Sequence, residues 1–210
     1  MVHAPRRVPI ALRDKLKASL DELVRNNVIS PVKEPTDWVS SLVVVEKKNG
    51  KLRLCIDPKD LNKELKRSHY PLPTLEEIIP DLHNAKVFST FDARNGYWQI
   101  KLTEESSYLT TFNTPFGRYR WLRMPFGISS ASEEYQRRMI EALGDLDGVK
   151  IFVDDILVYG QGDTMDAAMK DHDQKVHKLF QRLDENNIKL NHEKIQFKQN
   201  KLKYMGHLIT

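Results

Sequence analysis

Apolar residues recur at intervals of three and four near the N-terminus, and this spacing predicts an amphipathic helix over about Ala11–Ile29. Two strand-like runs follow, at Leu42–Glu46 and Lys51–Ile56, and Lys48-Asn49-Gly50 between them indicates a hairpin turn. The first part of the chain is therefore expected to combine a helix with a β-hairpin. The apolar stripe of the helix comprises Leu12, Leu16, Leu20, Leu23, Val24 and Val28.

The rest of the chain alternates strand-like and helix-like patterns. Thr74 and Glu77 form a capping-box pattern for a short helix that Pro80 should end. Beyond it the order is β, α, β, β, α, β, the split βαβ arrangement of an α+β fold. Thr110–Trp121, inserted after the first strand, is predicted to form a hairpin turning at Pro115-Phe116-Gly117. The six elements are Lys86–Phe91, Ser130–Leu143, Val149–Val153, Ile156–Tyr159, Met165–Asn187 and Ile188–Leu190.

Composition excludes several classes of protein. The 210 residues carry 33 Lys and Arg against 29 Asp and Glu, a formal net charge of only +4. No apolar run approaches the ~20 residues of a transmembrane helix, and the N-terminus lacks the apolar region of a secretory signal. The single cysteine, Cys55, excludes an internal disulfide and a thiolate-rich zinc site, and it fits a reducing compartment.

The small net charge hides an uneven distribution. Residues 1–70 and 191–210 are net basic, whereas residues 141–170 are net acidic. Basic flanks around an acidic centre suit a polyanion held on both sides of a metal-binding cluster. A solvated charged surface is the alternative.

Asp154 and Asp155 lie between two strongly apolar runs. A two-residue turn is one interpretation, although Asp-Asp fits such a turn poorly, because the turn prefers positive φ. Asp92 ends the strand that the split βαβ sheet places beside this pair, so three carboxylates are expected at one sheet edge. Oxygen ligands without His or Cys indicate Mg²⁺, and two such ions support phosphoryl transfer.

Other kinds of site lack support. The seven histidines show no metal-ligand spacing, and His172 and His177 are expected to be exposed on a polar helix. No phosphate-binding loop or dinucleotide fingerprint is present.

Six segments along the chain carry motifs of one enzyme family: Leu52–Lys63, Tyr70–Pro73, Phe91–Gln99, Arg123–Ala131, Phe152–Asp155 and Leu202–His207. In this order, and over nearly the whole chain, they resemble the motifs of reverse transcriptases, and Phe152-Val-Asp-Asp155 resembles the Tyr/Phe-X-Asp-Asp box of that family. The match is strongest to gypsy-like long-terminal-repeat retrotransposon Pol polyproteins.

The resemblance implies the fingers and palm of a right-hand polymerase. Fingers are expected at 1–85 and a palm at 86–210, with a fingers-like hairpin insertion around 104–125 and an end at the primer grip. The palm would be a split βαβ (ferredoxin-like) antiparallel sheet with helices on one face. No thumb or RNase H region is expected within these residues.

The resemblance also implies the activity, that of an RNA-directed DNA polymerase using two-metal catalysis. Asp92, Asp154 and Asp155 would be the catalytic and metal-binding residues for two Mg²⁺ ions, for which Mn²⁺ could substitute. The Ala93 carbonyl would be an accessory ligand.

The remaining implied residues contact nucleotide and primer. Lys48 and Arg53 would hold the triphosphate, or else belong to a solvated basic hairpin. Tyr97 would be the steric gate against a ribose 2′-hydroxyl, compatible with an ordinary core aromatic. Lys194 would protonate pyrophosphate, or be a surface lysine. Phe126 and Gly127 complete the nucleotide pocket, and Met205, Gly206 and His207 form the primer grip.

The implied partners are an RNA or DNA template with its primer, deoxynucleoside triphosphates, and the thumb, RNase H and integrase of a full-length product. No membrane is expected, and the implied location is the cytoplasm, in a virus-like particle if the element is complete. A catalytically silent nucleic-acid-binding fragment of a decayed element is the alternative. An RNA-templated RNA polymerase is disfavoured by Tyr97.

Overall fold

The computed structural model describes residues 1–46 and 50–210, which form two compact units. Unit 1 comprises Met1–Arg67 and Tyr97–Ala131, and unit 2 comprises Ser68–Gly96 and Ser132–Thr210. The first segment ends at Arg67, earlier than residue 85 of the expected fingers, and the second segment of unit 1 includes the expected insertion around 104–125. Lys48 and Asn49 of the predicted turn lie outside the described residues.

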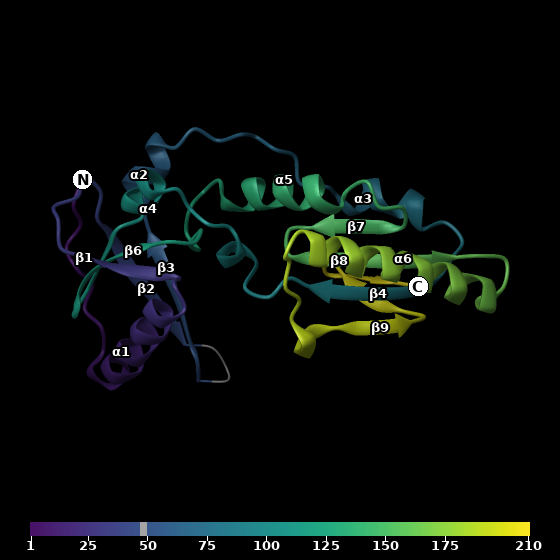
Figure 1. Ribbon diagram of the computed structural model, residues 1–210, viewed down its shortest axis with the longest axis horizontal. Coiled ribbons are helices and arrows are strands. Elements are labelled where there is room, and N and C mark those ends of the chain that lie inside the picture. Colours follow the sequence, from purple (N-terminus) through teal and green to yellow (C-terminus); the bar gives the residue numbers. More distant parts are fainter. Residues whose placement is uncertain (47–49) are drawn as a thin grey trace. The chain divides into compact units, whose positions relative to one another are not determined.

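Unit 1 contains a five-stranded sheet in the order β1-β6-β5-β2-β3 (Figure 1). The first helix ends at Arg25, earlier than predicted, since Ile29 begins a strand that pairs with Trp121. Leu16 and Leu20 of this helix are fully buried in the core beneath the sheet. The elements are α1 (Ile10–Arg25), β1 (Ile29–Val32), β2 (Ser40–Glu46), β3 (Leu52–Asp57), α2 (Lys59–Glu64), α4 (Glu104–Leu109), β5 (Phe112–Thr114) and β6 (Gly117–Trp121).

The inserted hairpin is confirmed as β5 and β6, paired from Phe112↔Tyr119 to Thr114↔Gly117. It belongs to unit 1, where β5 pairs with β2 and β6 with β1. The insertion therefore completes the sheet of unit 1.

The loop after β6 is held against β3 by backbone contacts. The Ile56 N–H donates to the Phe126 carbonyl over 3.1 Å. Gly127 has a φ of +113°, and a Cβ there would lie 2.0 Å from the Ile56 carbonyl oxygen. The side-chain amide of Asn62 donates to the Gly127 carbonyl (2.9 Å) and accepts from the Ser129 N–H (3.0 Å). Only glycine fits at position 127.

Unit 2 contains a four-stranded antiparallel sheet in the order β7-β8-β4-β9 (Figure 1). The chain order β4, α5, β7, β8, α6, β9 confirms the predicted split βαβ arrangement. The elements are β4 (Ala85–Asp92), α5 (Ala131–Leu143), β7 (Val149–Phe152), β8 (Asp155–Gln161), α6 (Met165–Glu185) and β9 (Gln196–Gln199).

The predicted last strand, Ile188–Leu190, is wrong. Leu190 makes only an isolated bridge to Ala93, and the strand that pairs with β4 is β9. All four residues of β9 are exposed and carry no apolar alternation, so the pattern gave no reason to place a strand there.

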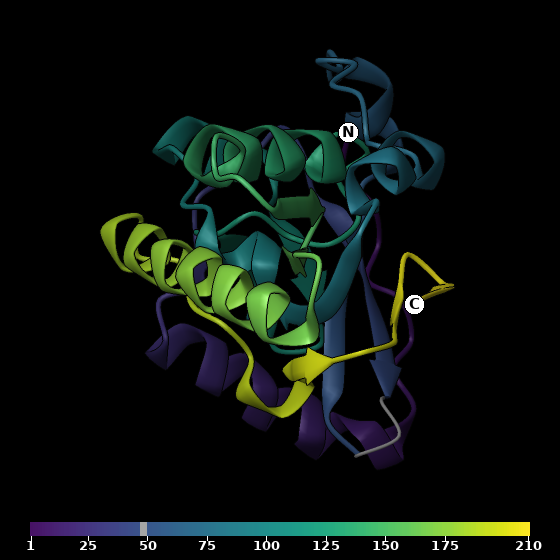
Figure 2. The ribbon, with the colours of Figure 1, turned by 90° about the vertical axis from the view of Figure 1, so that its right-hand side faces the viewer.

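Both faces of this sheet are covered. Helix α6 lies across β8 and β4 on one face (Figures 1 and 2), where Phe180 meets the ring of Phe91 edge-on. On the other face, Phe88 and Leu157 share a core cluster with Ile78. Ile78 ends α3 (Leu75–Ile78), which opens with the predicted Thr74–Glu77 capping box; Pro80 lies in the 3₁₀ turn η1 (Ile79–Leu82) that follows. No helix in the described ranges is long and apolar enough to cross a membrane.

His172 is fully buried under the sheet, contrary to the expected exposure, whereas His177 is exposed as predicted. The Nδ1 of His172 lies 3.3 Å from a carboxylate oxygen of Asp173, so in the neutral ring the proton is on Nδ1. The Nε2 of His172 then accepts a hydrogen bond from the Ser89 hydroxyl (2.8 Å). Ser89 Oγ in turn accepts the Lys198 N–H (2.9 Å). Burial lowers the pKa of His172, and the charge of Lys198 acts in the same direction.

We expect Gly127→Ala to destabilise unit 1 much more than Gly117→Ala. Both glycines have a φ of +113°, but a Cβ at Gly117 meets no atom within 4 Å. Alanine at Gly117 therefore meets only backbone strain, about 1–3 kcal/mol. Alanine at Gly127 adds overlap with a backbone oxygen, for a further loss of about 2 kcal/mol. Urea unfolding followed by tryptophan fluorescence checks this, and equal losses would contradict the close approach at Gly127.

We also expect the free energy of unfolding to fall as the pH falls through about 6.5, the ordinary pKa of histidine. The folded-state pKa of His172 is lowered, so the unfolded chain takes up the proton first and the stabilisation present above pH ~6.5 is lost below it. Denaturant unfolding at several pH values should show a weaker dependence in His172→Gln than in the wild type, with the matched exposed-histidine variant His177→Gln unchanged. The same pH dependence in all three chains would refute this role.

Candidate active site

The site lies where the β4–β8 ladder ends. The two strands pair from Ala85↔Gln161 to Asp92↔Asp155, so the last two residues opposite each other are both aspartates. Ile156 and Leu157 are both fully buried, on opposite faces of the sheet. Gly160 restricts the register, because a Cβ there would lie 2.2 Å from the Ala168 carbonyl oxygen of α6, and a slip of one residue would place Tyr159 or Gln161 in its position. The packing of the sheet against α6 therefore places two carboxylates side by side.

Asp154 lies in the tight turn between β7 and β8. Phe152 and Asp155 are the closing pair, so the turn residues are Val153 and Asp154, and only one of the two adjacent aspartates lies in the turn. The Ala93 N–H donates to the Asp154 carbonyl over 2.8 Å. This bond ties the β7–β8 turn (Val153 and Asp154) to the end of β4 and brings the third carboxylate residue to the site.

The carboxylates repel one another in a partly buried setting. Asp92 is only 8% exposed. The pKa of Asp155 is raised, first by burial and then by the negative charges of Asp154 and Asp92. Such a cluster gains from a nearby cation.

Lys194 supplies a cation from the far side of β4. Its Nζ lies 2.6 Å from Asp92 Oδ2, and this hydrogen bond raises the pKa of Lys194. The lysine reaches the site because Lys189–Asn191 runs beside Asp92–Arg94: the Arg94 N–H donates to the Lys189 carbonyl (2.8 Å) and the Asn191 N–H donates to the Asp92 carbonyl (2.9 Å). Asn191 then caps the 3₁₀ helix η3 (His192–Lys194).

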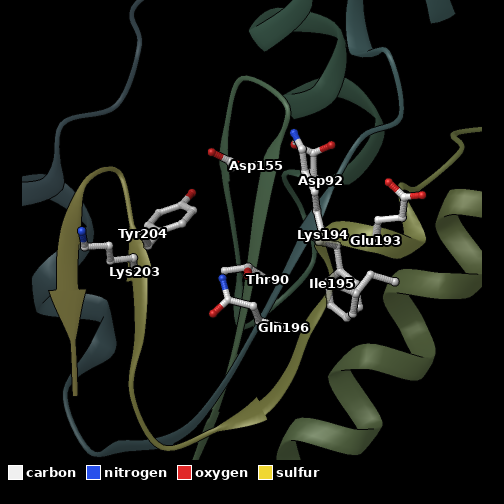
Figure 3. Close-up of a pocket in the computed structure, with 10 residues that line it drawn as sticks. Thr90, Asp92, Asp155, Glu193, Lys194, Ile195, Gln196, Lys203 and Tyr204 are labelled. Atoms are coloured by element: carbon white, nitrogen blue, oxygen red, sulfur yellow. The ribbon is translucent and has the colours of Figure 1, made fainter. Parts of the chain in front are cut away.

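A cavity of about 440 Å³ opens beside the carboxylates (Figure 3). The Tyr204 side chain reaches it from β10 (Leu202–Tyr204), and its buried hydroxyl has no hydrogen-bond partner among the described residues. Burial and the charge of Asp155 raise the pKa of Tyr204. The lining residues are Thr90, Phe91, Asp92, Asp155, Glu193, Lys194, Ile195, Gln196, Lys203 and Tyr204.

The donor set fits a hard divalent cation, because it consists of carboxylate oxygens with no nitrogen or sulfur ligand. Within residues 1–46 and 50–210, no three Asp, Glu, His or Cys side chains are gathered as a metal-holding group. One oxygen of Asp92 instead faces the ammonium of Lys194. The residue types therefore suit the predicted Mg²⁺, although in this structure one oxygen of Asp92 is bound by Lys194.

Three of the predicted nucleotide-pocket residues lie together in unit 1. The Arg53 guanidinium lies 5.3 Å from the centroid of the Phe126 ring, and the Tyr97 ring lies 5.0 Å from it at 42°. Gly127 follows Phe126 in the loop held against β3. Lys48, the other predicted triphosphate ligand, lies outside the described residues.

The predicted primer-grip residues form the turn of a two-stranded hairpin. Tyr204 pairs with His207 across β10 and β11 (His207–Ile209), so Met205 and Gly206 are the turn residues, with φ of 50° and 82°. Positive φ at both positions is the conformation that glycine relieves. The cavity beside the carboxylates is lined by Lys203 and Tyr204 of the same hairpin.

Two polar contributions were not predicted from the sequence. Asn62, which holds the loop of Phe126 and Gly127, lies within the motif segment Leu52–Lys63 but has no implied role there. Tyr204 lies in the same way within Leu202–His207. Asn62 contacts residues more than 60 positions away, and Tyr204 lines a cavity with the distant Asp92 and Asp155, so no local pattern reports either residue.

Comparison with known proteins identifies the family. The profile described as reverse transcriptase (RNA-dependent DNA polymerase) matches residues 45–209. The retrovirus-related Pol polyprotein from transposon 412 of Drosophila melanogaster is 31% identical over 97% of this chain, and the enzymatic polyprotein of cauliflower mosaic virus (strain Strasbourg) is 33% identical over 92%. The Pol polyprotein from transposon gypsy of Drosophila melanogaster is 28% identical over 96%. The chain spans only 16%, 28% and 19% of these relatives, respectively.

Solved structures support the same fold. The protease-reverse transcriptase of prototype foamy virus superposes with a TM-score of 0.85 at 22% identity, covering 98% of this chain and 26% of that one. A foamy viral protease-reverse transcriptase in complex with double-stranded DNA gives 0.87 at 21% identity, covering 100% of this chain and 36% of that one. The fingers–palm fold class indicated by the motifs is confirmed, and the chain belongs to the reverse transcriptase (RNA-dependent DNA polymerase) family.

Proposed function

We propose that this chain is the fingers and palm portion of an RNA-directed DNA polymerase of a retrotransposon Pol polyprotein. It adds deoxynucleotides to the 3′-hydroxyl of a primer paired with an RNA or DNA template. The observation that carries the proposal is the register Asp92↔Asp155, with Asp154 in the adjoining turn, in a chain of the reverse transcriptase family. Phosphoryl transfer needs such a cluster, because cations held there offset charge on the transferred phosphate.

Asp92, Asp154 and Asp155 would hold two Mg²⁺ ions, or Mn²⁺ in their place. The mutual repulsion that raises the pKa of Asp155 supports this role, since bound cations relieve it. When bound, the ions would polarise the primer 3′-hydroxyl and neutralise charge on the phosphate oxygens. The Ala93 carbonyl would be an accessory ligand, and the hydrogen bond from the Ala93 N–H to the Asp154 carbonyl keeps this residue beside the turn.

The aromatic cluster of unit 1 would receive the incoming nucleotide. Arg53, with Lys48, would bind the triphosphate through charge-assisted hydrogen bonds. Phe126 is adjacent to both Arg53 and Tyr97 and would pack against the sugar or base, with Gly127 permitting close approach of the backbone. Tyr97 would exclude a ribose 2′-hydroxyl, which favours deoxynucleotides over ribonucleotides.

Lys194 would offset charge on the departing pyrophosphate, for which its raised pKa keeps it protonated. Met205, Gly206 and His207 would position the primer terminus. A foamy viral protease-reverse transcriptase of the same fold was solved with an RNA/DNA hybrid, which supports a nucleic-acid duplex as partner here. The thumb, RNase H and integrase of a full-length Pol product would be further partners, and the location would be a virus-like particle in the cytoplasm.

Primer extension tests the proposal. With an RNA template, a labelled DNA primer and Mg²⁺ or Mn²⁺, we expect Asp154→Asn to reduce extension by about a hundredfold or more, because a ligand charge is lost. The exposed Asp163→Asn makes the same charge change and should extend as the wild type does. The melting temperature of Asp154→Asn should not fall, since one repelling charge is removed. Equal extension by wild type and Asp154→Asn would refute the mechanism.

The contact between Lys194 and Asp92 predicts competition between the ammonium and a metal ion. We expect Lys194→Met to bind Mn²⁺ about tenfold more tightly in calorimetric titration without nucleic acid. This factor is the worth of one charge-assisted hydrogen bond, reduced because the lysine side chain is largely exposed.

Lys203→Met is the matched control for this titration. Lys203 lines the same cavity, and no ion pair joins it to the three aspartates among the described residues. The variant therefore removes a nearby charge without removing the contact. Equal changes in the two variants would show that only the general electrostatic field had changed.

A further inference from the structure

Gln136 is a fully buried polar side chain with no part in the function proposed above. It lies on α5, and both ends of its amide contact the strand and turn that carry Asp154. Its Nε2 donates to the Ile151 carbonyl over 3.0 Å, and its Oε1 accepts the Val153 N–H over 2.6 Å. Both hydrogen bonds go to the backbone on either side of Phe152, directly before the two aspartates.

The two backbone groups explain why this residue is an amide. One is an acceptor and the other a donor, so the side chain must offer one donor and one acceptor at once. A carboxylate has no donor, and an apolar side chain has neither group. The two partners also fix the orientation of the amide, because the reverse orientation would place the amide oxygen against the Ile151 carbonyl and the amide nitrogen against the Val153 N–H.

These backbone groups need a partner because of their place in the sheet. β7 is an edge strand in the order β7-β8-β4-β9, so one row of its N–H and C=O groups has no neighbouring strand. A buried backbone group without a partner is costly, and a side chain from α5 satisfies the Ile151 carbonyl of β7 and the Val153 N–H of the turn that follows.

Val153 adds an independent sign of constraint. Its φ is 54°, in the left-handed region that a β-branched residue adopts at a cost. The Val153 N–H is the group that Gln136 accepts. The hydrogen bond is therefore made to the strained residue itself, one position before Asp154.

The other side of the turn is held as well. The Ala93 N–H donates to the Asp154 carbonyl over 2.8 Å. Gly96 packs closely against Asp154, since a Cβ at Gly96 would lie 3.1 Å from the Tyr135 ring and 3.3 Å from Asp154 Cβ. With Gln136 on one side and Ala93 on the other, the backbone of Asp154 has little freedom to move.

We propose that Gln136 is a positioning residue that holds the β7–β8 turn in its strained conformation and thereby sets the placement of Asp154 and Asp155 for metal binding. The proposal rests on the function proposed above for the carboxylates. Its structural part, that Gln136 holds the turn, can be measured without any metal or substrate.

The first experiment compares amide hydrogen exchange at Val153 in the wild type and in Gln136→Met, which keeps the length of the side chain and loses both hydrogen bonds. We expect the Val153 N–H to exchange about tenfold faster in the variant, the equivalent of one hydrogen bond, while the Leu157 N–H in the middle of the sheet is unchanged. Leu143→Ala is the control, because it creates a cavity on the same helix without contacting the turn. An unchanged Val153 exchange rate in Gln136→Met would overturn the proposal.

The second experiment is a Mn²⁺ titration of the same chains. We expect the half-saturating Mn²⁺ concentration of Gln136→Met to rise about tenfold, and primer extension to fall on the order of ten- to a hundredfold, because misplaced ligands bind and catalyse poorly. Reversible partial unfolding in Leu143→Ala would raise the half-saturating concentration only by the inverse of the folded fraction, which is less than about twofold while most of the chain is folded. Irreversibly unfolded chain would lower only the amount of Mn²⁺ bound. Faster exchange with unchanged Mn²⁺ affinity would overturn the positioning role.

A double variant tests the link to Val153. Asparagine tolerates the left-handed region, so a chain with Val153→Asn depends less on the hydrogen bond from Gln136. We therefore expect Gln136→Met to cost less Mn²⁺ affinity when it is added to Val153→Asn than when it is added to the wild type. Full additivity of the two changes would overturn the link. If Gln136→Met does not fold, Gln136→Glu, which keeps an acceptor for Val153 and loses the donor to Ile151, allows the same comparisons. A wild-type chain without Mn²⁺ binding and primer extension would overturn the proposed function, and the exchange rates would still decide whether Gln136 holds the turn.

Discussion

Repulsion between carboxylates at the end of the β4–β8 ladder is the constraint on which the rest of the site depends. Asp92 and Asp155 are opposite each other at the end of a ladder in which neighbouring side chains such as Ile156 and Leu157 are fully buried. Burial of one such side chain contributes about 1.5–3 kcal/mol, whereas two like charges 4 Å apart near a protein surface repel by roughly 1–4 kcal/mol. Several buried apolar residues therefore outweigh the repulsion, and the fold can hold charges together that would otherwise separate.

The surroundings of the carboxylates follow from this constraint. Lys194 provides a compensating charge, and it reaches Asp92 only because Lys189–Asn191 runs beside the end of β4. The turn that carries Asp154 is tied on one side by Ala93 and on the other by Gln136. An ammonium in contact with Asp92 and a rigid turn have different consequences for a metal: the first competes with it, and the second reduces the reorganisation that its binding requires.

Local patterns predicted the parts of the fold that are specified locally. The split βαβ order, the Thr74–Glu77 capping box and the inserted hairpin all depend on neighbouring residues, and the structure confirms them. β9 was missed because its residues are all exposed, so its place depends on backbone pairing with β4. His172 was misassigned because its partner, Ser89, lies 83 positions away. The first segment of unit 1 ends at Arg67 and not at residue 85, and Ile78 in the segment between packs with Phe88 and Leu157 of the sheet of unit 2.

The candidate site divides in the same way. Motif resemblance indicated the three aspartates, Arg53 and Phe126 as candidate site residues, but it did not indicate the amides that hold the neighbouring backbone. Asn62 and Gln136 each offer one donor and one acceptor to backbone groups outside a regular ladder. Hydrophobic periodicity assigns a polar side chain to the solvent, so it does not predict that such an amide is buried. A polar residue within an otherwise apolar helix face, beside a turn that carries functional residues, is therefore a reason to look for an irregular backbone that needs it.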